Sequence, residues 1–409
     1  MGNLSTEELL IIGCGLVIMS YIFSIISNYL KVPSVLLLLF AGIAFKAIAD
    51  SSGVNIAFSP QLIELLGVVG LIMIVLEAGL DLKLSRGKLK LIKSSFFSAL
   101  IILVLSTAMV TAILYFWLHQ PLLNCLVYAL PLSIMSSSIV IPSIHHLTEN
   151  KKEFLIYEAS FSDILGILAF NYFAAPVTLT GGSVLVFSGN LLLSIVFSVV
   201  LSLVLFLILT RTKLNIKFFL IFSLLVIIYA SGKMIHLPSL IIILVFGLLI
   251  NNWELVKIKI LQRFFQNEQV MALRDLLHSI TAESSFLIRT FFFLLFGFSI
   301  SFAFLQEPEV ILVGSLIVLV LFLTRYIYLR FSLHTNIFPE VFFIPRGLIT
   351  IVLFYKIPGH LKLASFNEGI LFFVILVTSV IMMFGMLFYK KGPEEMVEEG
   401  QFPERPDIL

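Results

Sequence analysis

The sequence predicts an all-α polytopic membrane protein, and three observations lead to this fold class. Apolar side chains make up 60% of the 409 residues and charged ones only 12%, about half of the ~25% in soluble domains. Many apolar runs are long enough to cross a bilayer, and basic residues gather in the loops on one side of it. This composition excludes a soluble enzyme, and a net charge of +2 leaves no basic field for a nucleic acid. The two cysteines and seven histidines show no metal-ligand spacing, so we expect no cofactor.

About thirteen apolar runs approach the ~20 residues that cross the ~30 Å hydrocarbon core. Backbone groups must pair internally in lipid, so the runs are expected to be helices. They cover approximately 9–29, 33–49, 60–80, 92–117, 121–147, 152–174, 183–210, 215–232, 237–251, 277–303, 308–330, 337–357 and 367–389. The break at 252–276 mixes apolar and basic residues and predicts a helix on the membrane surface.

The basic residues predict the orientation of these spans. Loops on one side hold nineteen lysines and arginines, and loops on the other side hold four. The positive-inside rule therefore places the N-terminus outside and the C-terminus in the cytoplasm, with the chain spanning the cell (inner) membrane. Residues 1–390 form one transmembrane unit, and 391–409 form a short acidic cytoplasmic tail.

Charged residues inside the apolar runs are candidates for function, because a charge at the bilayer centre costs at least ~2.5–3.5 kcal/mol. Asp163 lies in the middle of the sixth run, and Glu158 stands about 140° away on the same helix. The alternative is that both carboxylates are buried ion-pair partners. Arg325 lies deep in the eleventh run, where it either pairs with Glu158 or extends to the nearby interface. Arg289 is expected to reach the interface, with Glu283 as a possible partner, and the role of Glu77 stays open.

The fifth and twelfth runs carry the marks of interrupted helices. In the fifth run, Pro131 and Pro142 bracket Ser136-Ser137-Ser138, and the twelfth contains Pro345-Arg346-Gly347. Proline removes a backbone donor, and serine hydroxyls can satisfy the groups that it frees. Two broken helices at matching places indicate two inverted-topology repeats, although two ordinary proline kinks would look similar.

At these residues the sequence resembles the monovalent cation:proton antiporter superfamily over nearly its whole length. VLEAGLDLKLSRGKL resembles the segment "LFEGGL…L" after the third helix, and EASFSD (158–163) is similar to the E-S-x-x-N-D element of sodium/proton exchangers. FFFLLFGFSISF resembles the F-F-x-x-x-G stretch, IPRGLITIVL the G-x-R-G element, and Arg325 stands where the electroneutral branch has an arginine. Ala159 and Ser162 depart from the E-S-x-x-N-D element. The T-D-P of the family's first broken helix is replaced by Ser136-Ser137-Ser138, which is closer to the S-S-T of the potassium-efflux branch.

The resemblance implies a homodimer in which a core domain moves against a dimerisation domain. The core would comprise approximately 92–174 and 308–389, and the dimerisation helices approximately 9–80 and 183–303. The two broken helices would cross at the membrane midplane, with Asp163 beside the crossing. Glu158 and Arg325 would form an ion pair that holds the core together.

These residues predict exchange of Na⁺, or of K⁺ or Li⁺, for H⁺, without covalent chemistry and therefore without enzyme activity. Asp163 would bind the cation or the proton, because burial favours the neutral carboxyl and a bound cation favours the ionised one. Hydroxyl ligands for the cation would come from Ser137, Ser138, Ser160 and Ser162. Glu77 and Arg346 are secondary candidates for the site, without an assigned role as ligands. Because Ser162 does not titrate, the exchange would be electroneutral. The alternatives are a sodium-coupled symporter of a small organic anion, a channel and a structural protein, but the core has few polar residues for a cavity or pore.

Overall fold

The computed structural model describes 6–30, 32–51, 60–84, 86–144, 146–174, scattered positions between 189 and 204, 218–234, 239–255, 267–299, 306–332 and 337–389. These residues form helices and connecting segments, with no strand among them. The α-helices are α1 (Thr6–Leu30), α2 (Ser34–Ser51), α3 (Pro60–Asp81), α4 (Leu89–Leu118), α5 (Leu122–Ser133), α6 (Ser137–Ser143), α7 (Glu149–Phe173), α9 (Phe218–Met234), α10 (Ser239–Asn251), α12 (Asn267–Ser299), α13 (Pro308–Ser332), α14 (Leu348–Tyr355) and α15 (Glu368–Phe388). Short 3₁₀ segments occur at Arg86–Lys88 (η1), Trp253–Leu255 (η2), Glu340–Phe342 (η4) and Gly359–Leu361 (η5).

This all-α architecture confirms the predicted fold class. Six of the described helical segments are long and apolar enough to cross a membrane by length and composition, and three shorter apolar helices accompany them. The run expected at 183–210 and the tail at 391–409 lie mostly or wholly outside the described residues.

The expected surface helix at 252–276 is wrong for its second half. Residues 267–276 are the first turns of α12, which continues to Ser299 without a break. They contain no proline or glycine, and Val270, Leu273 and Leu277 are buried at helical spacing. This segment therefore packs as part of a 33-residue helix.

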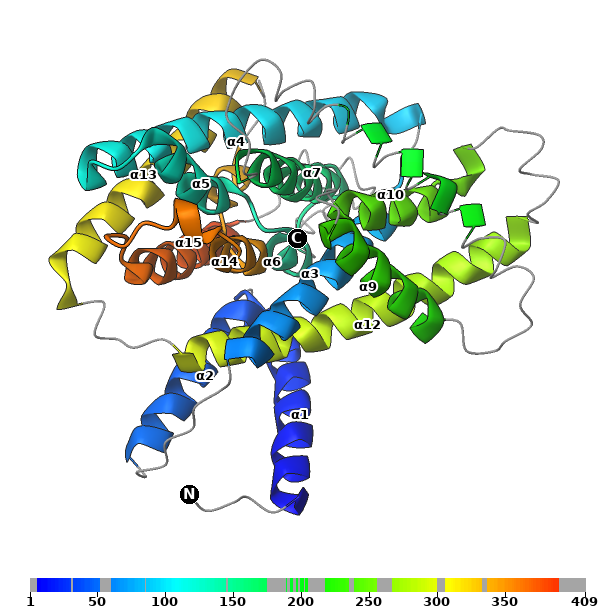
Figure 1. The fold of residues 1–409 in the computed structure, drawn as a ribbon, viewed down its shortest axis with the longest axis horizontal. Coiled ribbons are helices and arrows are strands. Elements are labelled where there is room, and N and C mark those ends of the chain that lie inside the picture. Colours follow the sequence, from blue (N-terminus) through cyan, green and yellow to red (C-terminus); the bar gives the residue numbers. More distant parts are fainter. Residues whose placement is uncertain are drawn as a thin grey trace, which may run out of the picture.

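The helices pack in two groups (Figure 1). In one group α4 packs against α5, α7 and α13, and α13 packs against α15. In the other, α12 packs against α2 and α3, and α3 packs against α10. The helix α14 contacts both α5 and α3, so it lies where the groups meet.

Glycines allow the closest helix contacts in the second group. A Cβ atom on Gly79 of α3 would lie 2.8 Å from the carbonyl oxygen of Leu244 on α10 and 3.1 Å from the Cα of Gly247. Between α2 and α12, a Cβ on Gly42 would lie 2.2 Å from the carbonyl oxygen of Leu294. Small residues let helix backbones approach in this way where lipid supplies no hydrophobic driving force.

Both predicted helix interruptions are present. The fifth run divides into α5 and α6, with non-helical backbone at residues 134–136 between them. The twelfth run consists of η4, a non-helical stretch at 343–347, and α14. The two breaks meet, because the backbone N–H of Ser136 donates a 3.0 Å hydrogen bond to the carbonyl oxygen of Pro345.

Candidate ion-binding site

Asp163 on α7 faces the break between α5 and α6. Its Oδ2 accepts a 3.2 Å hydrogen bond from the backbone N–H of Ser137, the first residue of α6, and another from the Ser137 hydroxyl. Its Oδ1 is buried and has no hydrogen-bond partner among the described residues. Only 3% of Asp163 is exposed, so the carboxylate has one satisfied oxygen and one that could take a ligand.

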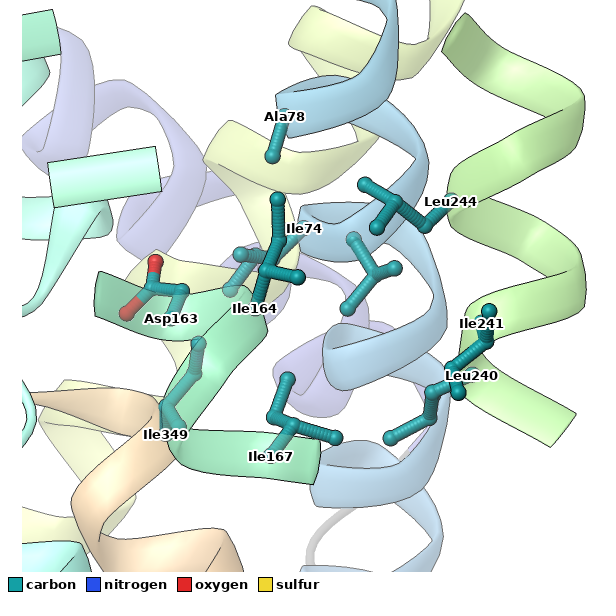
Figure 2. Close-up of a pocket in the computed structure, with 10 residues that line it drawn as sticks. Ile74, Ala78, Asp163, Ile164, Ile167, Leu240, Ile241, Leu244 and Ile349 are labelled. Atoms are coloured by element: carbon teal, nitrogen blue, oxygen red, sulfur yellow. The ribbon is translucent and has the colours of Figure 1, made fainter. Parts of the chain in front are cut away.

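A small cavity lies beside Asp163, between α7 and the second group of helices (Figure 2). Its volume is about 20 Å³, which is room for about one water molecule. The facing wall is apolar and comes from α3 and α10, with Ile349 of α14 adding to it. Its residues on α3 and α10 are Ile74, Val75, Ala78, Leu240, Ile241 and Leu244. Asp163 is the one charged residue among those that line this cavity.

The four serines predicted as ligands lie in different surroundings. Ser137 contacts Asp163 directly, as described above. The Ser162 hydroxyl instead accepts a 2.9 Å hydrogen bond from the backbone N–H of Met135, and Ser138 lies 2.8 Å from Ser136, hydroxyl to hydroxyl. The hydroxyl of Ser160, one turn before Asp163, is fully buried without a partner among the described residues. Ser162 and Ser138 thus bond to residues of the break, Ser137 bonds to Asp163, and Ser160 keeps a buried hydroxyl without a described partner.

Glu158 and Arg325 are brought together inside the first group of helices. Arg325 Nη2 lies 2.7 Å from Glu158 Oε2, and Nη1 lies 3.1 Å from Oε1. Ser98 of α4 donates a further 2.5 Å hydrogen bond to Oε1, and Arg325 Nε donates a 2.7 Å bond to the carbonyl oxygen of Glu340. Both charged side chains are at most 2% exposed, so Arg325 does not extend to the membrane surface.

Arg346 joins the two broken helices through their carbonyl groups. Its Nε donates a 2.6 Å hydrogen bond to the oxygen of Leu132 at the end of α5, and its Nη1 donates a 3.0 Å bond to Ile344. The last carbonyls of a helix have no partner within it and carry partial negative charge. The buried guanidinium thus satisfies a helix end that the break leaves open.

Comparison with known proteins gives the family. A profile described as sodium/hydrogen exchanger, transmembrane, matches residues 16–389. The chain belongs to this family. Family members are transporters, and this one is an integral multi-pass membrane protein. No curated protein sequence matches the chain significantly.

Solved structures share the fold of this exchanger-family chain. One is the sodium proton antiporter MjNhaP1 from Methanocaldococcus jannaschii at pH 8, at 17% identity and a TM-score of 0.67. That match covers 91% of this chain and 99% of the other. An electron-microscopy structure of the same antiporter matches at 16% identity and a TM-score of 0.66, covering 98% and 100%.

In this member of the exchanger family, Glu77 is not among the residues that line the cavity beside Asp163, although its neighbour Ala78 is. Its Oε1 lies 3.5 Å from Nη2 of Arg289, so α3 and α12 share a partly buried ion pair. The expectation that Arg289 reaches the interface or pairs with Glu283 is therefore wrong. Glu283 instead accepts a 2.7 Å hydrogen bond from the hydroxyl of Tyr21 on α1.

The sequence alone does not predict the contacts of two further residues of this exchanger-family chain. Ser98 completes the surroundings of Glu158, and Lys151 donates hydrogen bonds to Glu340 Oε2 (2.9 Å) and to the carbonyl oxygen of Phe338 (2.7 Å). Lys151 thereby connects the start of α7 to the segment that Arg325 holds. A serine in an apolar helix gives a weak signal of such a role, but Lys151 looked like an ordinary loop charge.

Proposed function

We propose that this protein exchanges a monovalent cation for H⁺ across the membrane, and that Asp163 binds the two in turn. Na⁺ is the favoured cation, with K⁺ and Li⁺ as the other candidates. The observation that carries the proposal is the unpartnered Oδ1 of a buried carboxylate, at a helix break and beside a small cavity. Membership of the sodium/hydrogen exchanger family supports the same function.

Competition for Asp163 couples the two ions. The apolar wall favours the neutral, protonated carboxyl, and an arriving cation favours the ionised one. Each ion therefore displaces the other. An empty, charged carboxylate would be costly to carry past an apolar wall, so movement with neither ion is suppressed. Ser137 and Ser160 are the side-chain hydroxyls that would join Asp163 around the cation, with Ser162 and Ser138 ordering the break beside them.

We propose that the two groups of helices move against each other in a homodimer. The mobile core would comprise residues 92–174 and 308–389, and the dimerisation helices 9–80 and 183–303. The packing of α4 with α7 and α13, and of α3 with α10 and α12, supports this division. The strong loop-charge bias supports an outside N-terminus and a cytoplasmic C-terminus in a cell (inner) membrane.

An electroneutral ratio of one cation to one proton fits the charges near the site. Glu158 is engaged by Arg325, whose guanidinium does not release its proton under physiological conditions. Ser162 precedes Asp163, and Glu77 is paired with Arg289 and does not line the cavity. Asp163 is then the group that changes protonation. The alternative, a sodium-coupled symporter of an organic anion, is disfavoured by a cavity that holds about one water.

The test is a pH-jump assay on vesicles that contain the purified full-length chain. Na⁺, K⁺ and Li⁺ are added in turn, and the change in internal pH is measured after each addition. Protein-free vesicles and choline chloride serve as blanks. We expect at least one cation to drive proton movement in a saturable way. Proton movement that requires an added organic anion would favour the symporter, and no response to any cation would overturn the proposal.

A further inference from the structure

The segment before and at the start of α4 is the most basic part of the chain. Residues 83–93 contain five basic residues and no acidic one, whereas the whole chain has a net charge of only +2. These residues are Lys83, Arg86, Lys88, Lys90 and Lys93. Lys88 forms an ion pair with Glu153 of α7, and this hydrogen bond raises the pKa of Lys88. Lys90 and Lys93 are exposed, and neither has an ion-pair partner among the described residues.

The two lysines begin an exposed face that is otherwise apolar. Phe97, Ile101 and Val104 follow Lys93 at spacings of four, four and three residues, and Lys90 precedes it by three. The two lysines and the three apolar residues therefore share one side of α4. The three apolar residues are 52%, 37% and 57% exposed. In Figure 1, α4 runs along the upper edge of the molecule, with α5 and α7 below it in the view and α13 crossing behind it. This face therefore offers two positive charges at one end and an apolar strip along its length.

The lysines also stand at the unfavourable end of their helix. The positive end of the helix dipole favours acidic residues in the first turn. The first turn of α4 has none, and its N-cap residue, Lys88, makes no side-chain capping bond. By contrast, α7, α13 and α15 each have a glutamate in the first turn. A bound anion would offset the repulsion that the lysines add to α4.

We propose that this face binds an anionic phospholipid, with its phosphate at Lys90 and Lys93 and an acyl chain along Phe97, Ile101 and Val104. Charge complementarity identifies the headgroup, and the exposed apolar strip distinguishes a lipid from a free phosphate ion. Basic clusters directly beside a transmembrane helix attract anionic lipids in this way. The site is independent of the ion exchange proposed above, because binding to it can be measured without transport.

The experiment uses the purified full-length chain in a non-ionic detergent with added phosphatidylglycerol. Binding is counted by native mass spectrometry, and thermal unfolding is followed in parallel. Each lysine near a membrane surface contributes about fivefold to affinity, so the double variant Lys90→Gln/Lys93→Gln should bind about 25-fold more weakly. The charge-preserving Lys90→Arg/Lys93→Arg and the distant exposed Lys362→Gln should bind like the wild type.

Two further ligands decide the identity of the bound group. Phosphatidylcholine and inorganic phosphate should each bind more weakly than phosphatidylglycerol and raise the unfolding temperature less. Equal stabilisation by inorganic phosphate would overturn the lipid assignment, and equal binding of phosphatidylcholine would overturn the role of charge. Undiminished phosphatidylglycerol binding by a folded glutamine double variant would overturn the site itself. If that variant is misfolded, Lys90→Gln alone, with about fivefold weaker binding expected, takes its place.

Discussion

At the scale of single residues, Asp163 presents its two oxygens to different surroundings. Oδ2 accepts two hydrogen bonds from Ser137, and Oδ1 has no hydrogen-bond partner among the described residues. The first arrangement fixes the carboxylate, and the second leaves it able to take a proton or a cation. Both properties are useful in a carrier, since the binding group must keep its position while its ligand changes.

We expect Asp163→Asn to abolish exchange while the protein stays folded. Asparagine keeps the size of the side chain and an oxygen that can accept from Ser137, but it can neither release a proton nor supply a negative charge. Vesicle pH-jump assays and gel filtration would measure activity and fold. The control is Glu149→Gln, which makes the same chemical change at the exposed start of α7. Cation-dependent proton flux in Asp163→Asn would refute the site.

Ser137→Ala should move the pH-activity profile to higher pH by about one unit. The Ser137 hydroxyl donates to the ionised carboxylate and so favours it over the protonated form. A hydrogen bond to a charged group contributes about 1.5–3 kcal/mol, so its loss lets the proton compete more strongly. Ser143→Ala is the matched control, because that hydroxyl bonds the backbone of its own short helix. An unchanged profile in Ser137→Ala would contradict the role given to this hydroxyl.

Removing either partner of the Glu158–Arg325 pair should destabilise the protein strongly. A buried charge left without its partner costs about 3–5 kcal/mol. Glu158→Gln/Arg325→Met should therefore lose less stability than the sum of the two single changes. Thermal unfolding in detergent measures all three variants. Strictly additive losses would show that the two residues do not interact.

At the scale of helices, the close contact between α3 and α10 depends on a glycine, Gly79, on α3. Gly79→Ala would place a Cβ 2.8 Å from a backbone oxygen of α10, and a backbone atom cannot move away without shifting the helix. We expect a loss of about 1–3 kcal/mol in stability, typical of overpacking. Gly13→Ala on α1 is the control, because its Cβ would meet nothing within 4 Å. Equal unfolding temperatures for the two variants would argue against close packing of α3 and α10.

The sequence predicts the helix breaks better than the contacts around them. The break in the twelfth run contains Pro345, Arg346 and Gly347 themselves. The break in the fifth run lies between its two prolines, since Pro131 is inside α5 and Pro142 is inside α6. The bond from Ser136 to Pro345 depends on how two distant segments meet, which no local pattern encodes. The partner of Arg289 is hard to predict for a related reason. Several carboxylates lie within reach along the sequence, and the rotation of α12 against α3 selects Glu77.

Some residues of the candidate site can be predicted because membranes make isolated charges rare. Asp163, Glu158 and Arg325 stand out from apolar runs, which was enough to single them out. The different duties of the four serines could not be anticipated. A hydroxyl that bonds a backbone amide, such as Ser162, and one left unpartnered, such as Ser160, look alike in a sequence.

At the scale of the whole molecule, exchange should be insensitive to membrane voltage. One proton leaves for each monovalent cation that binds if Asp163 is the group that changes protonation, so no net charge crosses. The measurement imposes a potential with valinomycin and K⁺ on vesicles performing Na⁺/H⁺ exchange, provided that K⁺ is not itself a substrate. A set-point that shifts with the potential would refute the one-to-one ratio. Glu77→Gln would then test whether a second carboxylate takes part.

The pairing of Glu158 with Arg325 also has a consequence for biosynthesis. The two residues are 167 positions apart in the chain. At about 5–20 residues per second, a ribosome needs roughly 8–33 s to synthesise the segment between them. During that interval α7 has entered or approached the membrane with a carboxylate whose final partner does not yet exist. Insertion of α7 should therefore be delayed or assisted until α13 emerges, and a nascent chain arrested before residue 325 should leave α7 more accessible to water-soluble labels than the finished protein does.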